Sequence, residues 1–201
     1  MVAPIVSEML GERAHPDIEI RLASAQDSGQ IAEMYEIAFS EHILVHEGKL
    51  NNPEFINGMI ADPNVHYIVA SQNGKIVGAA ALAIADIIKG GEIERVVVAD
   101  EYRGNGLSKD LCGELVGVAK EQGLQYVFAF ARGGMKPMQK TFRNLGFEVF
   151  GVMPIFAIVH EGRVVRENFV HMGLLIEPES LYDNNDLIPE AQRLYDVINS
   201  E

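Results

Sequence analysis

The amino-acid sequence predicts an α/β fold built as a single domain. Segments with the two-residue alternation of β-strands and segments with the helical period follow one another along the chain. The chain has 201 residues, of which 48% are apolar and 22% charged, and this is ample for one full hydrophobic core. Near its middle a buried-looking strand runs through a glycine-rich turn into a helix. Collagen-like, low-complexity and largely disordered classes are therefore excluded.

The first part of the domain begins with a half-buried strand, because apolar and charged residues alternate over Ile18–Leu22. Ser24 is typical of a helix N-cap, and Asp27 three residues later takes the place that a capping box gives to Glu or Gln. The sequence predicts a helix from there to about residue 38. A polar, less regular stretch over 41–52 leads to a second short helix over Pro53–Ile60.

A hairpin follows with a strong local signal. The strand-like residues His66–Ser71 and Lys75–Ala85 flank Asn73 and Gly74, a pair that suits a type I′ turn. The next strand, Gly91–Ala99, ends in three consecutive valines and is expected to be buried.

The second part of the domain alternates again between helices and strands. Helix 105–121 has apolar residues on one stripe and Gly123 as its C-cap. The remaining elements are a buried strand over 124–131, a short helix over 137–145 and two long strands over 147–159 and 164–176. The expected order is β-α-α-β-β-β-α-β-α-β-β, with no internal repeat.

The chain is divided into three parts on these patterns. Residues 1–17 form an N-terminal extension, residues 18–176 form the domain, and residues 177–201 form an acidic C-terminal tail. The tail holds seven acidic residues against one basic residue. It also contains an amphipathic helix candidate with Pro189 in its first turn, its apolar stripe consisting of Leu187, Leu194, Tyr195 and Ile198.

The net charge of −13 argues against nucleic acid or an anionic membrane as the main partner, and leaves room for a cationic ligand. The single cysteine, Cys112, cannot form an internal disulfide, so a reducing compartment is expected. The N-terminus lacks the basic residues of a secretory signal. The longest apolar run, Ile76–Ile88, is shorter than the roughly 20 residues of a membrane helix. We expect a cytoplasmic protein.

The most informative segment runs from Glu94 to Ser108 and joins a strand to a helix. Gly104 and Gly106 allow positive φ or a close approach to a ligand. The free N–H groups at the helix start favour an anion, most plausibly a phosphate or pyrophosphate. The segment is neither a Walker A loop nor a Rossmann fingerprint. A purely structural turn is the alternative.

This loop resembles the acyl-CoA-binding motif of the GCN5-related N-acetyltransferase (GNAT) superfamily, which reads Arg/Gln-x-x-Gly-x-Gly/Ala. Here Arg103-Gly-Asn-Gly106-Leu-Ser108 matches the first two fixed positions of this motif and departs from it at the last, where Ser replaces Gly or Ala. A second family motif, aromatic-x-x-x-Gly-Phe, is similar to Phe142-Arg-Asn-Leu-Gly146-Phe147. The resemblance covers about 18–176 and includes the order of elements.

The resemblance implies a central twisted mixed sheet with helices on both faces, in which strands 4 and 5 splay apart to admit the pantetheine arm of acetyl-CoA. It implies transfer of an acetyl group to a primary amine by direct attack in a ternary complex. The cofactor-binding residues would be Val96, Val98, Arg103, Gly104, Asn105, Gly106, Leu107 and Ser108. Lys109 and, nearer the second motif, Arg132, Lys136 and Gln139 are further cofactor candidates. A homodimer through the final strands or the tail is possible.

Acyl transfer needs a base for the amine and a stabilised oxyanion. Glu92 and Glu94 share one face of a strand, and several family members place a catalytic Glu there. Glu94 is preferred because it lies nearer the thioester end, and an ordinary solvent-facing carboxylate is the alternative for both. The resemblance implies a backbone N–H near Val98 as the oxyanion donor.

The expected general acid is where the sequence departs from the family. Phe142 occupies the position of a common tyrosine and has no proton to give. The thiolate then leaves unaided, Tyr102 or Tyr126 substitutes, or the chain is a non-catalytic acyl-CoA sensor. A transferase of a longer acyl group is a further alternative.

The resemblance implies acceptor contacts from the connection between the first two helices and from the last strand. The candidates are His42, His46, Asn168 and His171, with solvated side chains as the alternative. His42 and His46 have a spacing found in metal sites, but no His-Glu-x-x-His motif or other ligand cluster accompanies them. We therefore expect no metal.

Overall fold

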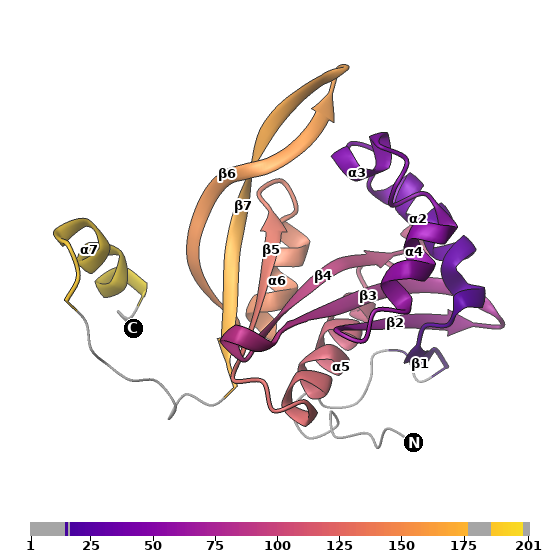
Figure 1. The fold of residues 1–201 in the computed structure, drawn as a ribbon, viewed down its shortest axis with the longest axis horizontal. Coiled ribbons are helices and arrows are strands. Elements are labelled where there is room, and N and C mark those ends of the chain that lie inside the picture. The colour runs from indigo at the N-terminus through magenta and orange to yellow at the C-terminus, as the bar shows by residue number, and fades with distance from the viewer. Residues whose placement is uncertain (1–14, 16, 177–185, 199–201) are drawn as a thin grey trace.

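A seven-stranded mixed sheet forms the centre of the structure, a computed structural model that describes residues 15, 17–176 and 186–198 (Figure 1). Its strand order is β1-β2-β3-β4-β5-β7-β6. Every neighbouring pair is antiparallel except β4 and β5, which run parallel. The strands are β1 (Glu19–Leu22), β2 (Val65–Gln72), β3 (Lys75–Ala85), β4 (Gly90–Val98), β5 (Tyr126–Arg132), β6 (Glu148–His160) and β7 (Arg163–Leu175).

Helices cover both faces of this sheet (Figure 1). The α-helices are α2 (Ser28–Ala38), α3 (Ile43–His46), α4 (Pro53–Ile60), α5 (Leu107–Glu121), α6 (Lys136–Asn144) and α7 (Pro189–Ile198), and the 3₁₀ helices are η1 (Ala25–Asp27), η2 (Asp86–Ile88) and η3 (Asp100–Tyr102). Alternate side chains of β2 serve two cores, since Ile68 joins the core under α5 and α6 while Tyr67 joins the core under α2 and α4. The α/β class and the two-faced arrangement are confirmed.

Local signals in the sequence place several of these elements. Asp27 accepts the Ser24 backbone N–H at 2.7 Å and the Ser24 hydroxyl at 2.9 Å, which is the capping role expected of it. Asn73 and Gly74 have φ of 52° and 78°, as a type I′ turn between β2 and β3 requires. The predicted helix Pro53–Ile60 is confirmed as α4, with Asn52 as its N-cap.

The strands β4 and β5 diverge after a short parallel contact. Gly90–Glu92 pairs with Tyr126–Phe128, and no further ladder pair joins the two strands. Both nevertheless continue, β4 as far as Val98 and β5 as far as Arg132. The splay between strands 4 and 5 implied by the resemblance is therefore present.

The β6–β7 hairpin curves from the sheet toward α3 (Figure 1). It is fastened there by the backbone: the Val159 N–H donates to the Glu41 carbonyl at 2.8 Å, and His42 forms an isolated antiparallel bridge with Ile158. The connection between α2 and α3 is thereby held against the edge strand β6.

The structure differs from the sequence-based expectations in one internal segment. The stretch 41–52, expected to be irregular, contains the one-turn helix α3. The extension 1–17 lies almost wholly outside the described residues, as do 177–185 and 199–201 of the tail. The predicted tail helix is α7, none of whose residues is buried. The three-part division of the chain and the homodimer stay predictions.

No helix among the described residues is both long and apolar enough to cross a membrane.

Candidate active site

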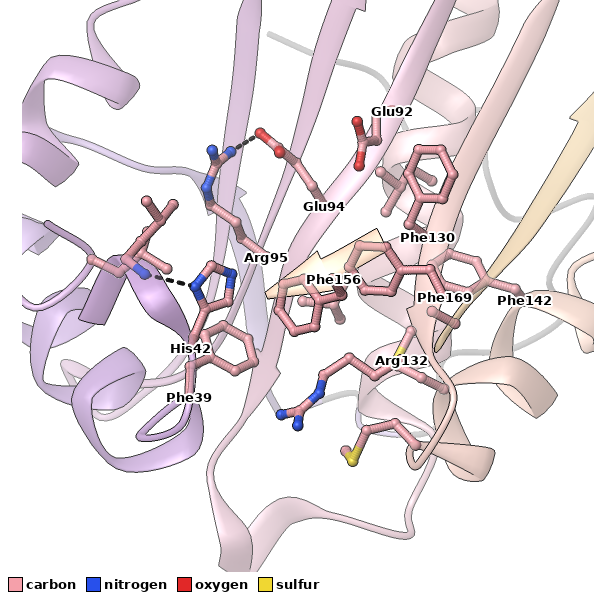
Figure 2. A pocket seen from close by; sticks show the side chains of 17 residues that line it. Phe39, His42, Glu92, Glu94, Arg95, Phe130, Arg132, Phe142, Phe156 and Phe169 are labelled. Atoms are coloured by element: carbon pink, nitrogen blue, oxygen red, sulfur yellow. Dashed lines mark hydrogen bonds and ion pairs between the residues drawn. The ribbon is translucent and has the colours of Figure 1, made fainter. Parts of the chain in front are cut away.

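A cleft of about 290 Å³ lies where β4 and β5 diverge (Figure 2). Its walls come from the α2–α3 connection, from β4 and β5, from α6 and from the β6–β7 hairpin. The lining residues are Phe39, His42, Leu44, Leu50, Glu92, Ile93, Glu94, Arg95, Val96, Phe130, Ala131, Arg132, Met135, Met138, Phe142, Phe156 and Phe169.

Glu92 and Glu94 both line this cleft from β4 (Figure 2), as their two-residue spacing leads one to expect. Glu94 forms an ion pair with Arg95. The Glu92 side chain makes no hydrogen bond or ion pair with any described residue, and burial raises its pKa above the ordinary glutamate value, against the opposing effect of the Arg95 charge. A carboxylate with a raised pKa is the better proton acceptor. The geometry thus favours Glu92, whereas the sequence favoured Glu94.

His42 lies on the opposite wall and caps α3. Its Nδ1 accepts the Leu44 N–H at 3.0 Å, so the proton of the neutral ring is on Nε2. Burial, with smaller contributions from the charges of Arg132 and Arg95, lowers the pKa of His42 to about 4. At neutral pH the side chain therefore presents an Nε2–H donor and does not serve as a base.

Arg132 ties three segments together at the edge of the cleft. Its guanidinium forms an ion pair with Glu167 of β7 at 2.7 Å and reaches Glu41 at 3.3 Å. Glu41 is in turn 3.5 Å from His160 of β6. The hydrogen bond from Arg132, followed by that from His160, holds the pKa of Glu41 below its usual range. The α2–α3 connection is thus linked through side chains to β5, β6 and β7.

Aromatic rings form much of the remaining wall. Phe156 stacks on Phe169 with ring centroids 4.3 Å apart, and Phe169 stacks on Phe130 at 5.6 Å. The Arg132 guanidinium carbon lies 5.5 Å from the centre of the Phe156 ring. Rings and carboxylates in one cleft are suited to a cationic ligand.

The other predicted acceptor residues do not line this cleft. His46 is exposed at the end of α3. Asn168 is also exposed, and its backbone carbonyl accepts the Gly133 N–H at 2.7 Å. His171 does not line the cleft but stacks on Phe130, which does, with ring centroids 4.8 Å apart. Of the four predicted acceptor residues, the structure brings only His42 into the cleft.

A second hollow, of about 590 Å³, lies at the start of α5. Gly104 and Gly106 have φ of 80° and 91°, the left-handed conformation anticipated for these glycines. No described residue accepts a hydrogen bond from the backbone N–H groups of 104–108. The hollow is lined by Gly104, Gly106, Ser108, Lys109, Lys136, Pro137, Lys140, Thr141 and Asn144. Directed N–H groups and three lysines fit the phosphates of a CoA molecule.

The Arg103 side chain and the Val98 backbone carbonyl, both predicted to take part in cofactor binding, are bonded to each other. The Arg103 Nε donates to the Val98 carbonyl at 3.0 Å, and its guanidinium pairs with Asp100 at 2.8 Å. Val96 lines the cleft, and Val98 does not. The Val96 backbone is therefore better placed than the Val98 backbone for an acyl group in the cleft. Asn105 and Leu107 belong to the same loop, with Leu107 buried. Their roles in cofactor binding stay predictions.

Phe142 is buried beside Phe147, with ring centroids 5.1 Å apart, and also borders the cleft. Neither tyrosine named as a substitute acid lines the cleft. The Tyr102 hydroxyl donates to Gln72 at 2.7 Å, and the Tyr126 hydroxyl lies 3.3 Å from His171 Nε2. The structure thus brings neither Tyr102 nor Tyr126 to the site.

Several site residues were not found from the sequence. Lys140 and Thr141 of α6 line the hollow at the start of α5, which is called the phosphate hollow below. The Thr141 hydroxyl lies 3.2 Å from that of Ser108. A lysine one helical turn after Lys136 was the available signal. In the aromatic wall, only Phe130 could be anticipated, from the alternation of side chains along β5. Phe156 and Phe169 reach the wall through the pairing of β6 and β7 with the rest of the sheet.

No three His, Cys, Asp or Glu side chains gather as metal ligands within the described part of the chain.

The fold and these two hollows define a class of protein. Residues 30–147 match the acetyltransferase (GNAT) family, and this match covers more than half of the 201 residues. The chain belongs to that family. The match confirms the family resemblance expected from the sequence.

Among named relatives, β-lysine N6-acetyltransferase of Methanococcus maripaludis is 25% identical over 146 residues, which are 71% of this chain and 52% of that protein. The chain thus spans about half the length of this relative. The ribosomal-protein-alanine N-acetyltransferase structure from Brucella melitensis has a TM-score of 0.67 at 22% identity, covering 79% of this chain and 99% of that one. A Salmonella typhimurium protein solved with its cofactor acetyl-CoA has a TM-score of 0.63 at 21% identity, covering 84% and 99%. These structures share the fold.

Proposed function

We propose that this chain transfers an acetyl group from acetyl-CoA to a primary amine of a small molecule or peptide, with Glu92 as the general base. The observation that carries the proposal is the cleft at the β4–β5 divergence. There a half-buried carboxylate without a partner among the described residues faces aromatic walls, and a separate hollow with the chemistry of a phosphate site lies at the start of α5.

The acceptor arrives as an ammonium ion with a pKa of about 10 and must lose a proton to become a nucleophile. Glu92 takes this proton directly or through one water. The amine nitrogen then bonds to the thioester carbonyl carbon, and the C–S bond breaks as the tetrahedral oxyanion collapses. The second amine proton passes to solvent. The products are the N-acetyl amide and CoA.

The leaving sulfur departs as a thiolate and takes its proton from solvent. A thiolate whose conjugate thiol has a pKa of about 8.5 is an acceptable leaving group without protonation by a tyrosine. Phe142 therefore does not block the reaction. We place the developing oxyanion beside the Val96 backbone, because Val96 and not Val98 lines the cleft.

The acetyl-CoA phosphates would lie at the start of α5, with the N–H groups of 104–108 and the side chains of Lys109, Lys136 and Lys140 as donors. A protein of net charge −13 needs such local cations to attract a polyanion. Phe130, Met138 and Phe142 line the cleft, and their bulk supports acetyl over longer acyl groups.

The acceptor is expected to be cationic. Glu92 and Glu94 in the cleft and Glu41 and Glu167 around Arg132 outnumber the two arginines there. The names of the two relatives given above, for β-lysine and for ribosomal-protein alanine, both specify N-acetylation of an amine.

The test is a panel of primary amines incubated with acetyl-CoA, with free thiol as the readout. We expect CoA release with at least one cationic amine, and a slower reaction with butyryl-CoA. Tight acetyl-CoA binding with no thiol released from any amine would instead identify an acyl-CoA sensor. Faster turnover of butyryl-CoA would identify a transferase of longer acyl groups.

A further inference from the structure

The strand β4 contains a bulge that sits in the wall of the cleft. Ala79 pairs with Val97 and Ala81 pairs with Glu94, so two residues of β4 face Ala80 alone. The first of them, Arg95, has φ of 56°. A left-handed backbone is strained at a residue other than glycine and persists only where its surroundings hold it.

A buried tyrosine holds this bulge. The Tyr35 hydroxyl donates to the Arg95 carbonyl at 2.9 Å and is also bonded to the Tyr67 hydroxyl. A carbonyl only accepts, so Tyr35 gives its single proton to Arg95, and Tyr67 gives its own to the Tyr35 oxygen. Both side chains are fully or almost fully buried, and burial raises the pKa of each, so both stay protonated.

The bulge decides how β4 faces the cleft. Pairing with β5 ends at Glu92, and the next residues that line the cleft include Glu94, Arg95 and Val96. The Arg95 carbonyl is thus a fixed point in the middle of the segment that faces the reacting groups. A displacement of about 1 Å in such a segment costs about a hundredfold in rate.

We propose that Tyr35 is a positioning residue for acyl transfer, whose hydroxyl fixes the β4 bulge and so sets the direction of Glu94, Arg95 and Val96 in the cleft. This inference rests on the function proposed above. Tyr35 does not touch the cleft itself; it acts through the Arg95 carbonyl. Its ring packs on Phe39 with centroids 5.1 Å apart, and a phenylalanine preserves that contact.

The chain offers a matched control. Tyr35→Phe and Tyr67→Phe each delete one hydroxyl from the same buried pair, but only the first removes the hydrogen bond to the bulge. We expect the two variants to lose similar thermal stability. Tyr35→Phe should lower kcat by about tenfold or more while the KM for acetyl-CoA stays within about twofold, and Tyr67→Phe should keep kcat within about twofold.

A rescue tests the route through the bulge. Glycine adopts positive φ without strain, so Arg95→Gly should let the bulge persist without Tyr35. We expect Tyr35→Phe to change kcat by less than about twofold in the Arg95→Gly background. Equal kcat losses in the two tyrosine variants, an unchanged kcat in Tyr35→Phe, or an undiminished effect in the Arg95→Gly background would each overturn the inference.

A crystal structure of Tyr35→Phe gives a readout that does not depend on activity. We expect Arg95 to leave the left-handed region in this variant and to keep it in Tyr67→Phe; an unchanged bulge would overturn the inference. Absence of thiol release by the wild-type protein would count against the proposed function alone, and this structural comparison would still decide the role of Tyr35.

Discussion

Arg132 of β5 and Glu41 of the α2–α3 connection are 91 residues apart in the chain, yet their side chains meet at 3.3 Å at the edge of the cleft. The Glu41 carbonyl accepts the Val159 N–H on the same side. This double attachment keeps Phe39 and His42 facing the β4 carboxylates. The wall that we propose for acceptor contact is therefore positioned by residues outside its own segment.

Glu41→Gln should raise the KM for the amine about two- to fivefold and leave kcat and the KM for acetyl-CoA unchanged, because solvent screens this half-exposed ion pair and its loss weakens binding only modestly. Steady-state kinetics measures this, and the melting temperature should hardly move. Glu47→Gln is the control, since Glu47 pairs with Lys49 on the outside of α3. An unchanged acceptor KM in Glu41→Gln would show that the attachment has no role in binding.

Glu92→Gln should lower kcat by about a hundredfold or more, because the base is lost, while acetyl-CoA binding stays intact. In the wild type the activity depends on the carboxylate, so kcat/KM should fall as the pH drops through the raised pKa of Glu92, above the ordinary glutamate value. A pH profile with the same acidic limb in Glu94→Gln and none in Glu92→Gln would assign the base. Full activity of Glu92→Gln refutes the assignment.

The same raised pKa has a consequence for stability with the opposite sign. The folded protein holds the Glu92 proton more tightly than the unfolded chain, so the folded state loses stability as the pH rises through the raised pKa. Above that range Glu92→Gln should therefore be as stable as the wild type or more stable. Urea unfolding at pH 7 measures this, and a marked loss of stability would mean that Glu92 has a structural partner.

His42 can be separated into its two roles by two substitutions. Asparagine is a good N-cap, so His42→Asn should keep the stability of the wild type. His42→Ala should lower the free energy of unfolding by about 1 kcal/mol. Both remove the Nε2–H donor and should lower kcat/KM for the amine by about tenfold. Because the pKa of His42 is lowered to about 4, its protonation should add no step to the activity profile between pH 6 and 7. Undiminished activity of His42→Asn would exclude contact with the acceptor.

Lys140→Ala tests the phosphate hollow at the start of α5. Loss of one cation should raise the KM for acetyl-CoA about three- to tenfold without changing kcat, and added salt should narrow the difference. Lys49→Ala removes an exposed lysine outside this hollow and is the control. Equal increases in the KM for acetyl-CoA in the two variants would mean that only the net charge of the protein matters, and would contradict a specific role of Lys140.

Much of the fold follows from short-range signals. The Asn73-Gly74 turn, the cap at Asn52 and the two loop glycines fix backbone angles within a few residues, so the elements around them are readable. Period-two patterning likewise places Glu92 and Glu94 on one face. The one-turn helix α3 escapes this reading because its cap is a histidine, which sequence rules do not expect at that position.

The parts that could not be predicted depend on contacts between distant segments. Arginine carries no signal for a left-handed backbone, and at Arg95 the conformation is held by a hydroxyl 60 residues earlier. Glu94 pairs with Arg95, whereas the Glu92 side chain has no described partner, and for this reason we propose Glu92 as the base. His46 fell outside the cleft because α3 is too short to carry both histidines inward.

The proposed CoA hollow and the proposed acceptor wall are built from separate stretches of chain. The phosphate hollow uses only 104–144, whereas Phe39, His42, Phe156 and Phe169 come from segments on either side of that stretch. On this proposal, substitutions in the acceptor wall can change the specificity for the amine without weakening the binding of CoA. A mutant library confined to these four positions is the economical way to retarget the enzyme, and natural drift in acceptor choice would follow the same division.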